Sequence, residues 1–186
     1  MDTLDTERLH LRRMTADDAD DLVALNNDPE VMRYLLADMP ATREDMVSGV
    51  LPYYRSFDGT PFGYWAAIER VGGQWLGWFL FRPPREDPAP GEIELGYRLT
   101  RAAWGHGYAT EGSRALVARG FTEHGVQVVV ADTMAANAGS RGVLEKVGLR
   151  LVKTWHDPAS DHLPGGELGE VGYALTQAEW AASAHA

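Results

Sequence analysis

Two glycines separated by one residue stand between a strand-like and a helix-like segment in the middle of the chain. Gly105 and Gly107 follow residues 92–99, where apolar and polar side chains alternate, and precede residues 108–121, where apolar side chains recur at helical spacing. A strand that enters a helix through glycines lets several backbone N–H groups converge on one anion, and the positive end of the helix dipole adds to their field. The segment is therefore predicted to hold a phosphate group, although the same glycines also suit a plain tight turn.

Two common phosphate-binding loops do not match these letters. A P-loop needs Lys followed by Ser or Thr after its second glycine, whereas Gly107 is followed by Tyr108 and Ala109. A dinucleotide-binding loop needs glycine or alanine three residues after Gly107, where this chain has Thr110. The letters of this loop therefore give only weak support to a nucleotide-binding domain.

The composition excludes several kinds of catalysis. The chain has no cysteine, which removes disulfides, thiolate metal sites and an acyl-cysteine mechanism together. It has no G-x-S-x-G elbow for a serine nucleophile. His124, His156 and His162 lack the spacing of metal ligands. No metal site is expected.

Charge and hydropathy bear on partners and location. The formal net charge is −10, a field that repels the phosphates of nucleic acids, although acidity of this kind also serves solubility alone. No run approaches the roughly 18 apolar residues of a membrane span, and the N-terminus is acidic without an apolar core. We therefore expect a cytoplasmic protein that binds neither nucleic acid nor membrane.

Elements on both sides of the glycine loop must position it. The 186 residues suffice for one domain that buries a core without metal or disulfide, and residues 1–186 are predicted to form one. The order of strands and helices predicts an α/β fold with a mixed sheet covered by helices on both faces. Strands are expected at 9–14, 64–70, 75–81, 93–99, 126–132, 149–155 and 171–175, and helices at 15–26, 31–35, 42–57, 108–121, 137–148 and from 176 onward.

Several motifs together resemble one family. ELGYRL at 94–99, WGHGYATE at 104–111 and NAGS at 137–140 are similar to blocks of the Gcn5-related N-acetyltransferases (GNAT), in particular the RimJ/RimL-like branch of ribosomal-protein acetyltransferases. EKVG at 145–148 and TERLHLR at 6–12 fit the same branch, so the resemblance spans roughly residues 5–180.

This resemblance implies a fold and an activity. The fold would be a mixed, mostly antiparallel central sheet with helices on both faces. The activity would be transfer of an acetyl group from acetyl-CoA to a primary amine, directly in a ternary complex, with a protein N-terminus or a small cationic amine as acceptor. Homodimers are common among the relatives. The alternative is a non-catalytic acyl-CoA-binding module with a regulatory or interaction role.

The resemblance also assigns residues to the cosubstrate. Backbone amides of the glycine loop would bind the pyrophosphate, with His106 and Arg101 at its edge, and the preceding strand would pair with the pantetheine arm. The wider superfamily often has Gln or Arg where this chain has Ala102, a minor loss for a loop that works through its backbone. The expected contacts are Leu95, Gly96, Tyr97, Ala102, Ala103, Trp104, Gly105, His106, Gly107, Tyr108, Ala109, Thr110 and Asn137.

Catalytic roles are assigned to two side chains. Glu94 is the first candidate for a base that takes the amine proton, with Glu92 and Asp132 as fallbacks, unless it faces solvent or pairs with Arg98. Ser140 is the expected proton donor to the thiolate. Asn followed three residues later by Ser is also a simple helix cap, so a capping role stays open for Asn137 and Ser140.

Two aromatic side chains are predicted to contact the acceptor. Tyr34 lies in the second predicted helix, and in the family the first two helices flank the acceptor side of the cleft. Trp65 lies in an aromatic pair of strands that would wall the same cleft. Large aromatic side chains at such positions also fill cores, and this alternative stays open for both.

Overall fold

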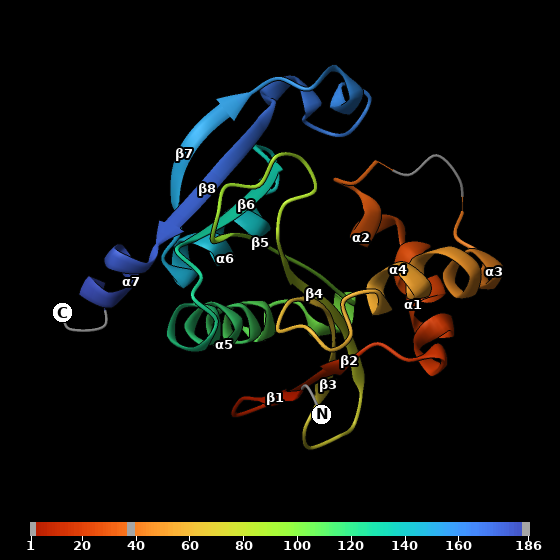
Figure 1. The fold of residues 1–186 in the computed structure, drawn as a ribbon. Helices are drawn as coiled ribbons and strands as arrows, with labels where there is room; N and C mark the ends of the chain where they lie inside the picture. Colours follow the sequence, from red (N-terminus) through yellow and green to blue (C-terminus); the bar gives the residue numbers. More distant parts are fainter. Residues whose placement is uncertain (1–2, 37–39, 184–186) are drawn as a thin grey trace.

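A computed structural model describes residues 3–36 and 40–183, and its centre is one eight-stranded sheet with helices on both faces (Figure 1). The strands lie in the order β1-β2-β3-β4-β5-β6-β8-β7, and every neighbouring pair is antiparallel except β5 and β6. This confirms the predicted mixed, mostly antiparallel sheet. The strands are β1 Thr3–Asp5, β2 Leu9–Arg13, β3 Gly63–Glu69, β4 Trp75–Arg82, β5 Glu92–Leu99, β6 Val128–Met134, β7 Arg150–Trp155 and β8 Glu170–Thr176.

Each face of the sheet buries a separate core, because side chains alternate between the faces of a strand. On β4, Phe79 and Phe81 point into the core beneath α5 and α6, whereas Trp78 and Leu80 point into the core beneath α1 and α4. The aromatic strands thus mainly fill cores. The helices are α1 Ala19–Asn26, α2 Pro29–Met32, α3 Arg43–Asp45, α4 Leu51–Arg55, α5 Tyr108–Glu123, α6 Ala138–Val147 and α7 Gln177–Ser183.

Helix α5 lies unusually close to β4 because two glycines face the strand. A Cβ atom at Gly112 would lie 2.4 Å from Phe79, and one at Gly120 would lie 2.6 Å from Phe81. The two glycines are eight residues apart, which places them on one side of the helix. The helix that begins at the glycine loop is therefore seated directly on the sheet.

The sheet opens between its two parallel strands. β5 and β6 pair only through Glu92–Glu94 and Val128–Val130. Beyond these residues β5 continues against β4 alone, and β6 continues against β8 alone. The two facing strand edges then have no strand between them, close to the start of α5.

Three details differ from the sequence-based predictions. The expected helix over 42–57 is interrupted by a π-helical turn at Met46–Val50, because Pro52 has no N–H for a regular helical hydrogen bond. Helix α2 ends at Met32, before Leu35. The three-residue β1 was not predicted.

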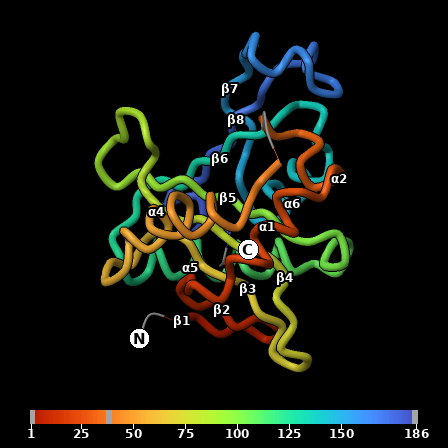
Figure 2. Tube along the Cα trace, turned by 90° about the vertical axis from the view of Figure 1, so that its right-hand side faces the viewer, coloured from red at the N-terminus to blue at the C-terminus, as the bar shows by residue number. Residues whose placement is uncertain are grey.

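The loops that flank β4 leave the body at opposite ends (Figure 2). A hairpin that contains Gly72 and Gly73 joins β3 to β4 at one end. The proline-rich loop joins β4 to β5 at the other end. The predicted strand ended at residue 81, but β4 also includes Arg82, which is its last residue and is buried.

Candidate active site

The glycine loop presents a row of backbone N–H groups. Gly105 and Gly107 have φ angles of +75° and +83°, a left-handed conformation that glycine adopts without strain. Among the described residues, no protein acceptor takes a hydrogen bond from the N–H groups of Gly105 through Thr110, and no side chain caps α5 at its start. These free donors and the helix dipole make the loop an anion cradle, so the residues fit the predicted phosphate.

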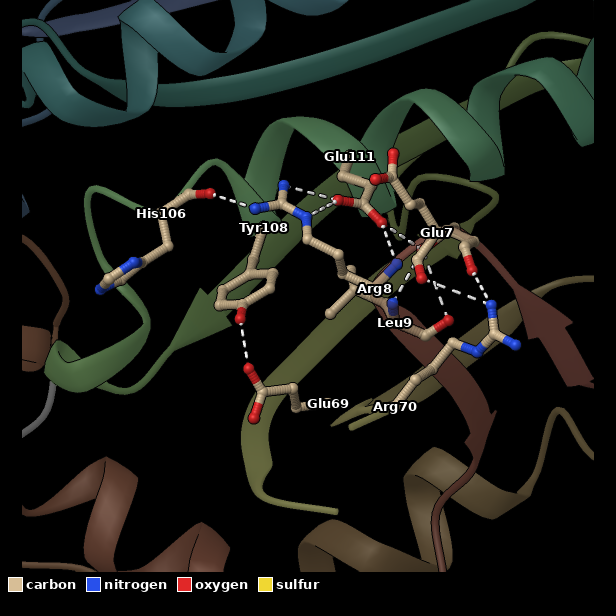
Figure 3. A network of polar contacts seen from close by, with 9 residues as sticks. Glu7, Arg8, Leu9, Glu69, Arg70, His106, Tyr108 and Glu111 are labelled. Atoms are coloured by element: carbon tan, nitrogen blue, oxygen red, sulfur yellow. Dashed lines mark hydrogen bonds and ion pairs between the residues drawn. The ribbon is translucent and has the colours of Figure 1, made fainter. Parts of the chain in front are cut away.

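A carboxylate in the first turn of α5 ties the loop between β1 and β2 to the site (Figure 3). Glu111 Oε1 accepts hydrogen bonds from Thr6 Oγ1 at 2.5 Å and from the Arg8 backbone N–H at 2.8 Å, while Oε2 accepts one from Arg8 Nε at 2.7 Å. Burial alone would raise the pKa of Glu111, but the hydrogen bonds from Thr6 and Arg8 outweigh it and lower the pKa. Glu111 is therefore held as an anion.

The guanidinium of Arg8 continues this network into the glycine loop (Figure 3). Arg8 Nη1 donates to the carbonyl oxygen of His106 at 2.8 Å, and the guanidinium carbon lies 4.8 Å from the centre of the Tyr108 ring. The Tyr108 hydroxyl donates to Glu69 Oε1 at 2.5 Å. The loop is thus anchored at its second and fourth residues, which fixes the direction of its amides.

A cavity of about 460 Å³ lies beside the cradle. Gly107 and Thr110 line it together with three cationic side chains, Arg8, Arg114 and Lys146, and two acidic ones, Glu7 and Glu111, of which Glu111 is paired with Arg8. Cations around free amides stabilise a polyanion more than either set alone. The arrangement suits a ligand with more than one phosphate.

Tyr97 and Ser140 meet where β5 and β6 diverge. The Tyr97 hydroxyl is buried and makes no regular hydrogen bond, although Ser140 lies beside it. Burial raises the pKa of Tyr97, and Ser140 offsets part of that rise. Asn137 Oδ1 accepts a hydrogen bond from the Ser140 N–H at 3.1 Å, so the predicted cap of α6 is present. Both hydroxyls are therefore next to the opening of the sheet.

Glu94 lies on the opposite face of β5 and pairs with a buried arginine. Its Oε2 atom is 3.0 Å from Arg82 Nη2, and Arg82 Nε donates to the Tyr64 hydroxyl at 3.2 Å. Burial raises the pKa of Glu94; Arg82 lowers it and Asp132 raises it further, and the net change is upward. A raised pKa makes Glu94 a stronger proton acceptor than an ordinary carboxylate. The alternative prediction, an ion pair between Glu94 and Arg98, is wrong, because Glu94 pairs with Arg82.

The two fallback bases are placed differently. Glu92 is the first residue of β5, and its Oε2 atom accepts a hydrogen bond from the Ala89 N–H in the β4–β5 loop. Asp132 is exposed and lies 3.6 Å from Lys153. Neighbouring protein atoms partly desolvate its carboxylate and raise its pKa, and Lys153 offsets part of that rise. Glu94 is the last β5 residue that pairs with β6, and Asp132 lies two residues beyond its partner Val130.

The predicted acceptor residues have contrasting positions. Trp65 is 0 % exposed, and its ring packs against the guanidinium groups of Arg13 and Arg119. A side chain without exposed surface does not contact an acceptor, so the core alternative holds for Trp65. Tyr34 follows α2, is half-buried and lies under the guanidinium of Arg33. Its predicted contact stays a prediction.

The remaining loop residues frame the cradle. Ala103 is buried, Ala102 is exposed, and Trp104 is 47 % exposed with its Nε1–H donated to the Leu99 carbonyl oxygen at 2.9 Å. Trp104 thereby fixes the loop to the end of β5. Within residues 3–36 and 40–183, no three acidic or histidine side chains gather as a metal site would need.

Sequence reasoning missed three arginines. The predicted strand 75–81 ends before Arg82, although extending the alternation by two residues places Arg82 on the same face of the strand as Trp78 and Leu80. Arg98 was considered only as a partner of Glu94. Arg8 carried no local signal, because its partner Glu111 is 103 residues away.

Comparisons with known proteins agree on one family. The model of the acetyltransferase (GNAT) domain matches residues 8–150. A protein from Aspergillus fumigatus named FsC-acetyl coenzyme A-N(2)-transacetylase is 32% identical over 96% of this chain and 77% of its own length. An uncharacterized N-acetyltransferase, p20 of Bacillus licheniformis, is 31% identical over 81% of this chain and 83% of its own length.

Solved structures show the same fold. A GNAT-family acetyltransferase from Bacillus anthracis superposes with a TM-score of 0.78 at 21% identity, covering 95% of this chain and 99% of that one. The aminoglycoside acetyltransferase AAC(6')-Ib in complex with coenzyme A superposes with a TM-score of 0.74 at 20% identity, covering 95% of this chain and 99% of that one.

In the part of this chain that the structure describes, no helix has the length and apolar character to cross a membrane.

Proposed function

We propose, since this chain belongs to the acetyltransferase (GNAT) family and is an acetyl-CoA-dependent N-acetyltransferase, that it transfers the acetyl group directly to a primary amine in a ternary complex. The observation that carries this proposal is the opening of the sheet between β5 and β6 next to the free amides of residues 105–110. The continuous sheet also supports one domain over residues 1–186. The acceptor is a small molecule or a protein N-terminus.

The chain's own groups would hold the cosubstrate along this opening. The amides from Gly105 to Thr110 would bind the pyrophosphate, with Arg8, Arg114 and Lys146 at its edge. The free edge of β5 at Leu95–Tyr97 would hydrogen-bond the pantetheine amides in the manner of an added strand. An N–H of the same edge would polarise the thioester carbonyl.

Two groups would move protons. Bound acetyl-CoA supplies the acetyl thioester that the amine nitrogen attacks. Glu94 would accept the amine proton, directly or through water, because burial keeps its proton affinity above that of an ordinary carboxylate. Ser140, beside the buried Tyr97 hydroxyl, would donate a proton to the departing thiolate. Acceptor amine and thiolate thus meet opposite faces of β5.

The name of the Aspergillus fumigatus relative supports nitrogen as the acceptor atom, because it specifies transfer to N(2). The alternative, a non-catalytic acyl-CoA-binding module, lacks an observation that favours it. It predicts acetyl-CoA binding without thiol release from any amine.

The first test is calorimetric titration with acetyl-CoA, desulfo-CoA and ATP. The variant Gly107→Trp should abolish CoA binding, because its side chain would enter the cradle. Gly73→Trp is the matched control, since Gly73 also has a positive φ of +69° with open space, but in the β3–β4 hairpin. Binding of ATP but not of CoA species would refute the assignment.

The second test addresses the base. Glu94→Gln should lower kcat/KM by roughly 100-fold at neutral pH with acetyl-CoA affinity unchanged, as expected on loss of general-base catalysis. Glu92→Gln, two residues away on the same strand, is the control and should keep the rate. Equal rates for both variants and the wild type would show that the amine arrives already deprotonated.

A further inference from the structure

Arg98 lies on the same face of β5 as Glu94 and pairs with no acidic side chain among residues 3–36 and 40–183. We infer that Arg98 binds a carboxylate of the acceptor, so that the preferred substrates are amines that also carry a carboxylate. This inference rests on the proposed function and names the substrate class for the same site.

Arg98 is held in place by one residue of α1. Its Nη1 atom donates to Asn26 Oδ1 at 2.5 Å, and its guanidinium carbon lies 5.3 Å from the centre of the Trp78 ring. Asn26 Nδ2 lies 3.5 Å from Met46 Sδ, which orients the amide with its oxygen toward Arg98. The guanidinium is therefore preorganised between a helix end and an aromatic face.

Most donors of this guanidinium remain unused. Arginine has five N–H donors, and within the described residues Arg98 makes one hydrogen bond, to Asn26. Arg98 is half-buried, and neither its Nε nor its Nη2 atom is fully enclosed by the described residues. In the described part of the chain, the titratable groups whose charge acts on Arg98 are Tyr54 and Tyr64, and neither is ionised at neutral pH, since burial raises the pKa of each. An accessible, preorganised fork without a carboxylate suits bidentate binding of one.

The position of Arg98 connects it to the proposed chemistry. Trp78 pairs with Arg98 in the sheet register, and Arg82 pairs with Glu94. Glu94 and Arg98 are four residues apart on β5 and therefore point to the same face of the sheet. An acceptor whose amine approaches Glu94 can extend along this face toward Arg98.

The charge on this face opposes the cationic acceptor predicted from the sequence. Glu94 is neutralised by Arg82, and Arg85 lies beyond it at 5.0 Å from the centre of the Tyr53 ring. Arg82 and Arg85 line a cavity of about 650 Å³ with Tyr53. Asp132, whose charge also acts on Glu94, is paired with Lys153, so Arg85 and Arg98 leave a positive surplus near Glu94 although the net charge of the chain is −10. A polycation would meet repulsion here, whereas an amino carboxylate would meet attraction.

The test uses amino carboxylates of increasing chain length, each paired with its own carboxamide, and measures thiol release from acetyl-CoA. For the best carboxylate, KM should be 10–100-fold lower than for its carboxamide, as expected for a charge-assisted arginine contact. Arg98→Gln should remove that difference by raising KM for the carboxylate, with little change in kcat. Arg98→Lys should restore part of it, because lysine keeps the charge but lacks the planar fork.

Calorimetric binding of acetyl-CoA verifies that each variant is folded. Arg55→Gln is the matched control, since Arg55 is an exposed residue of α4, which covers the same face of the sheet, and it pairs with Asp58. Thiol release without a carboxylate preference, or equal losses on carboxylate and carboxamide in Arg98→Gln, overturns the inference and leaves the proposed function standing. Acetyl-CoA binding without thiol release from any amine overturns both.

Discussion

Glu111→Gln is expected to destabilise the protein although it removes no atom from the core. The carboxylate accepts three hydrogen bonds from Thr6 and Arg8, and Oε2 also lies 2.6 Å from Arg8 Nη2. Glutamine keeps one acceptor oxygen but turns an NH₂ group toward the Arg8 donors. Hydrogen bonds to charged groups contribute about 1.5–3 kcal/mol each, reduced here because Arg8 is partly exposed. We expect a loss of about 2–3 kcal/mol in the free energy of unfolding.

Urea unfolding followed by tryptophan fluorescence measures this loss. A change of this size corresponds to roughly 4–12 °C in Tm for a domain of this length. Glu123→Gln is the control on the same helix, because Glu123 is exposed and pairs with Arg119 at i,i+4, a contact worth about 0.5 kcal/mol or less. Equal losses for both variants would refute the idea that Glu111 fixes the loop between β1 and β2.

The pH dependence gives an independent check. The pKa of Glu111 is lowered in the folded protein from its ordinary value of 4.5. Its contribution to stability is therefore fully present above the unfolded pKa and is lost as the pH falls through the folded pKa. The difference between wild type and Glu111→Gln should be constant near neutral pH and shrink below about pH 4.5. A difference that persists unchanged to lower pH would contradict the ionic origin.

The affinity for acetyl-CoA should also fall in Glu111→Gln. Arg8 holds the carbonyl of His106 in the glycine loop, so its release in Glu111→Gln should raise the Kd for acetyl-CoA by about 10-fold, the effect of about 1.4 kcal/mol. Calorimetric titration measures this change. An unchanged Kd together with reduced stability would show that the anchor serves folding alone.

Two further predictions concern the core and a buried ion pair. Gly112→Ala should cost about 1–3 kcal/mol in urea unfolding, because its Cβ would lie 2.4 Å from the Phe79 ring, whereas Gly142→Ala in α6, with open space, should gain about 0.5–1 kcal/mol. Similar effects of the two would refute the close approach of α5. Asp18→Asn should cost about 3 kcal/mol, because Asp18 is 2 % exposed and holds Arg12 through two hydrogen bonds. Burial raises the pKa of Asp18, but hydrogen bonds from Arg12 outweigh it and lower the pKa, so the difference should shrink below about pH 4; a difference that grows there would contradict this sign.

Much of the fold and the cradle follows from consecutive residues. The positive φ angles of Gly105 and Gly107, the hairpin at 71–74 and the Gly148 helix end are local backbone requirements that only a few residue types meet. The alternation in β5 and the helical spacing in α5 likewise lie within single segments. Such signals place the predicted phosphate loop between strand and helix, and the structure confirms that placement.

Other features depended on which segments become neighbours. Trp65 is an aromatic strand residue whether it lines a cleft or a core, and only the packing of β3 beneath α5 decides for the core. Glu94 was assigned a role from its place in a motif, but its partner Arg82 is fixed by the register of β4 on β5.

The sequence by itself determined the order of elements, the loop geometry and the family, because these depend on local periodicity and on backbone conformations specific to glycine. Only the tertiary structure decided the long-range contacts. Glu111 and Arg8 are joined across 103 residues, and Arg98 meets Asn26 across 72. No local pattern encodes such pairs, since each forms only when the sheet brings two distant segments side by side.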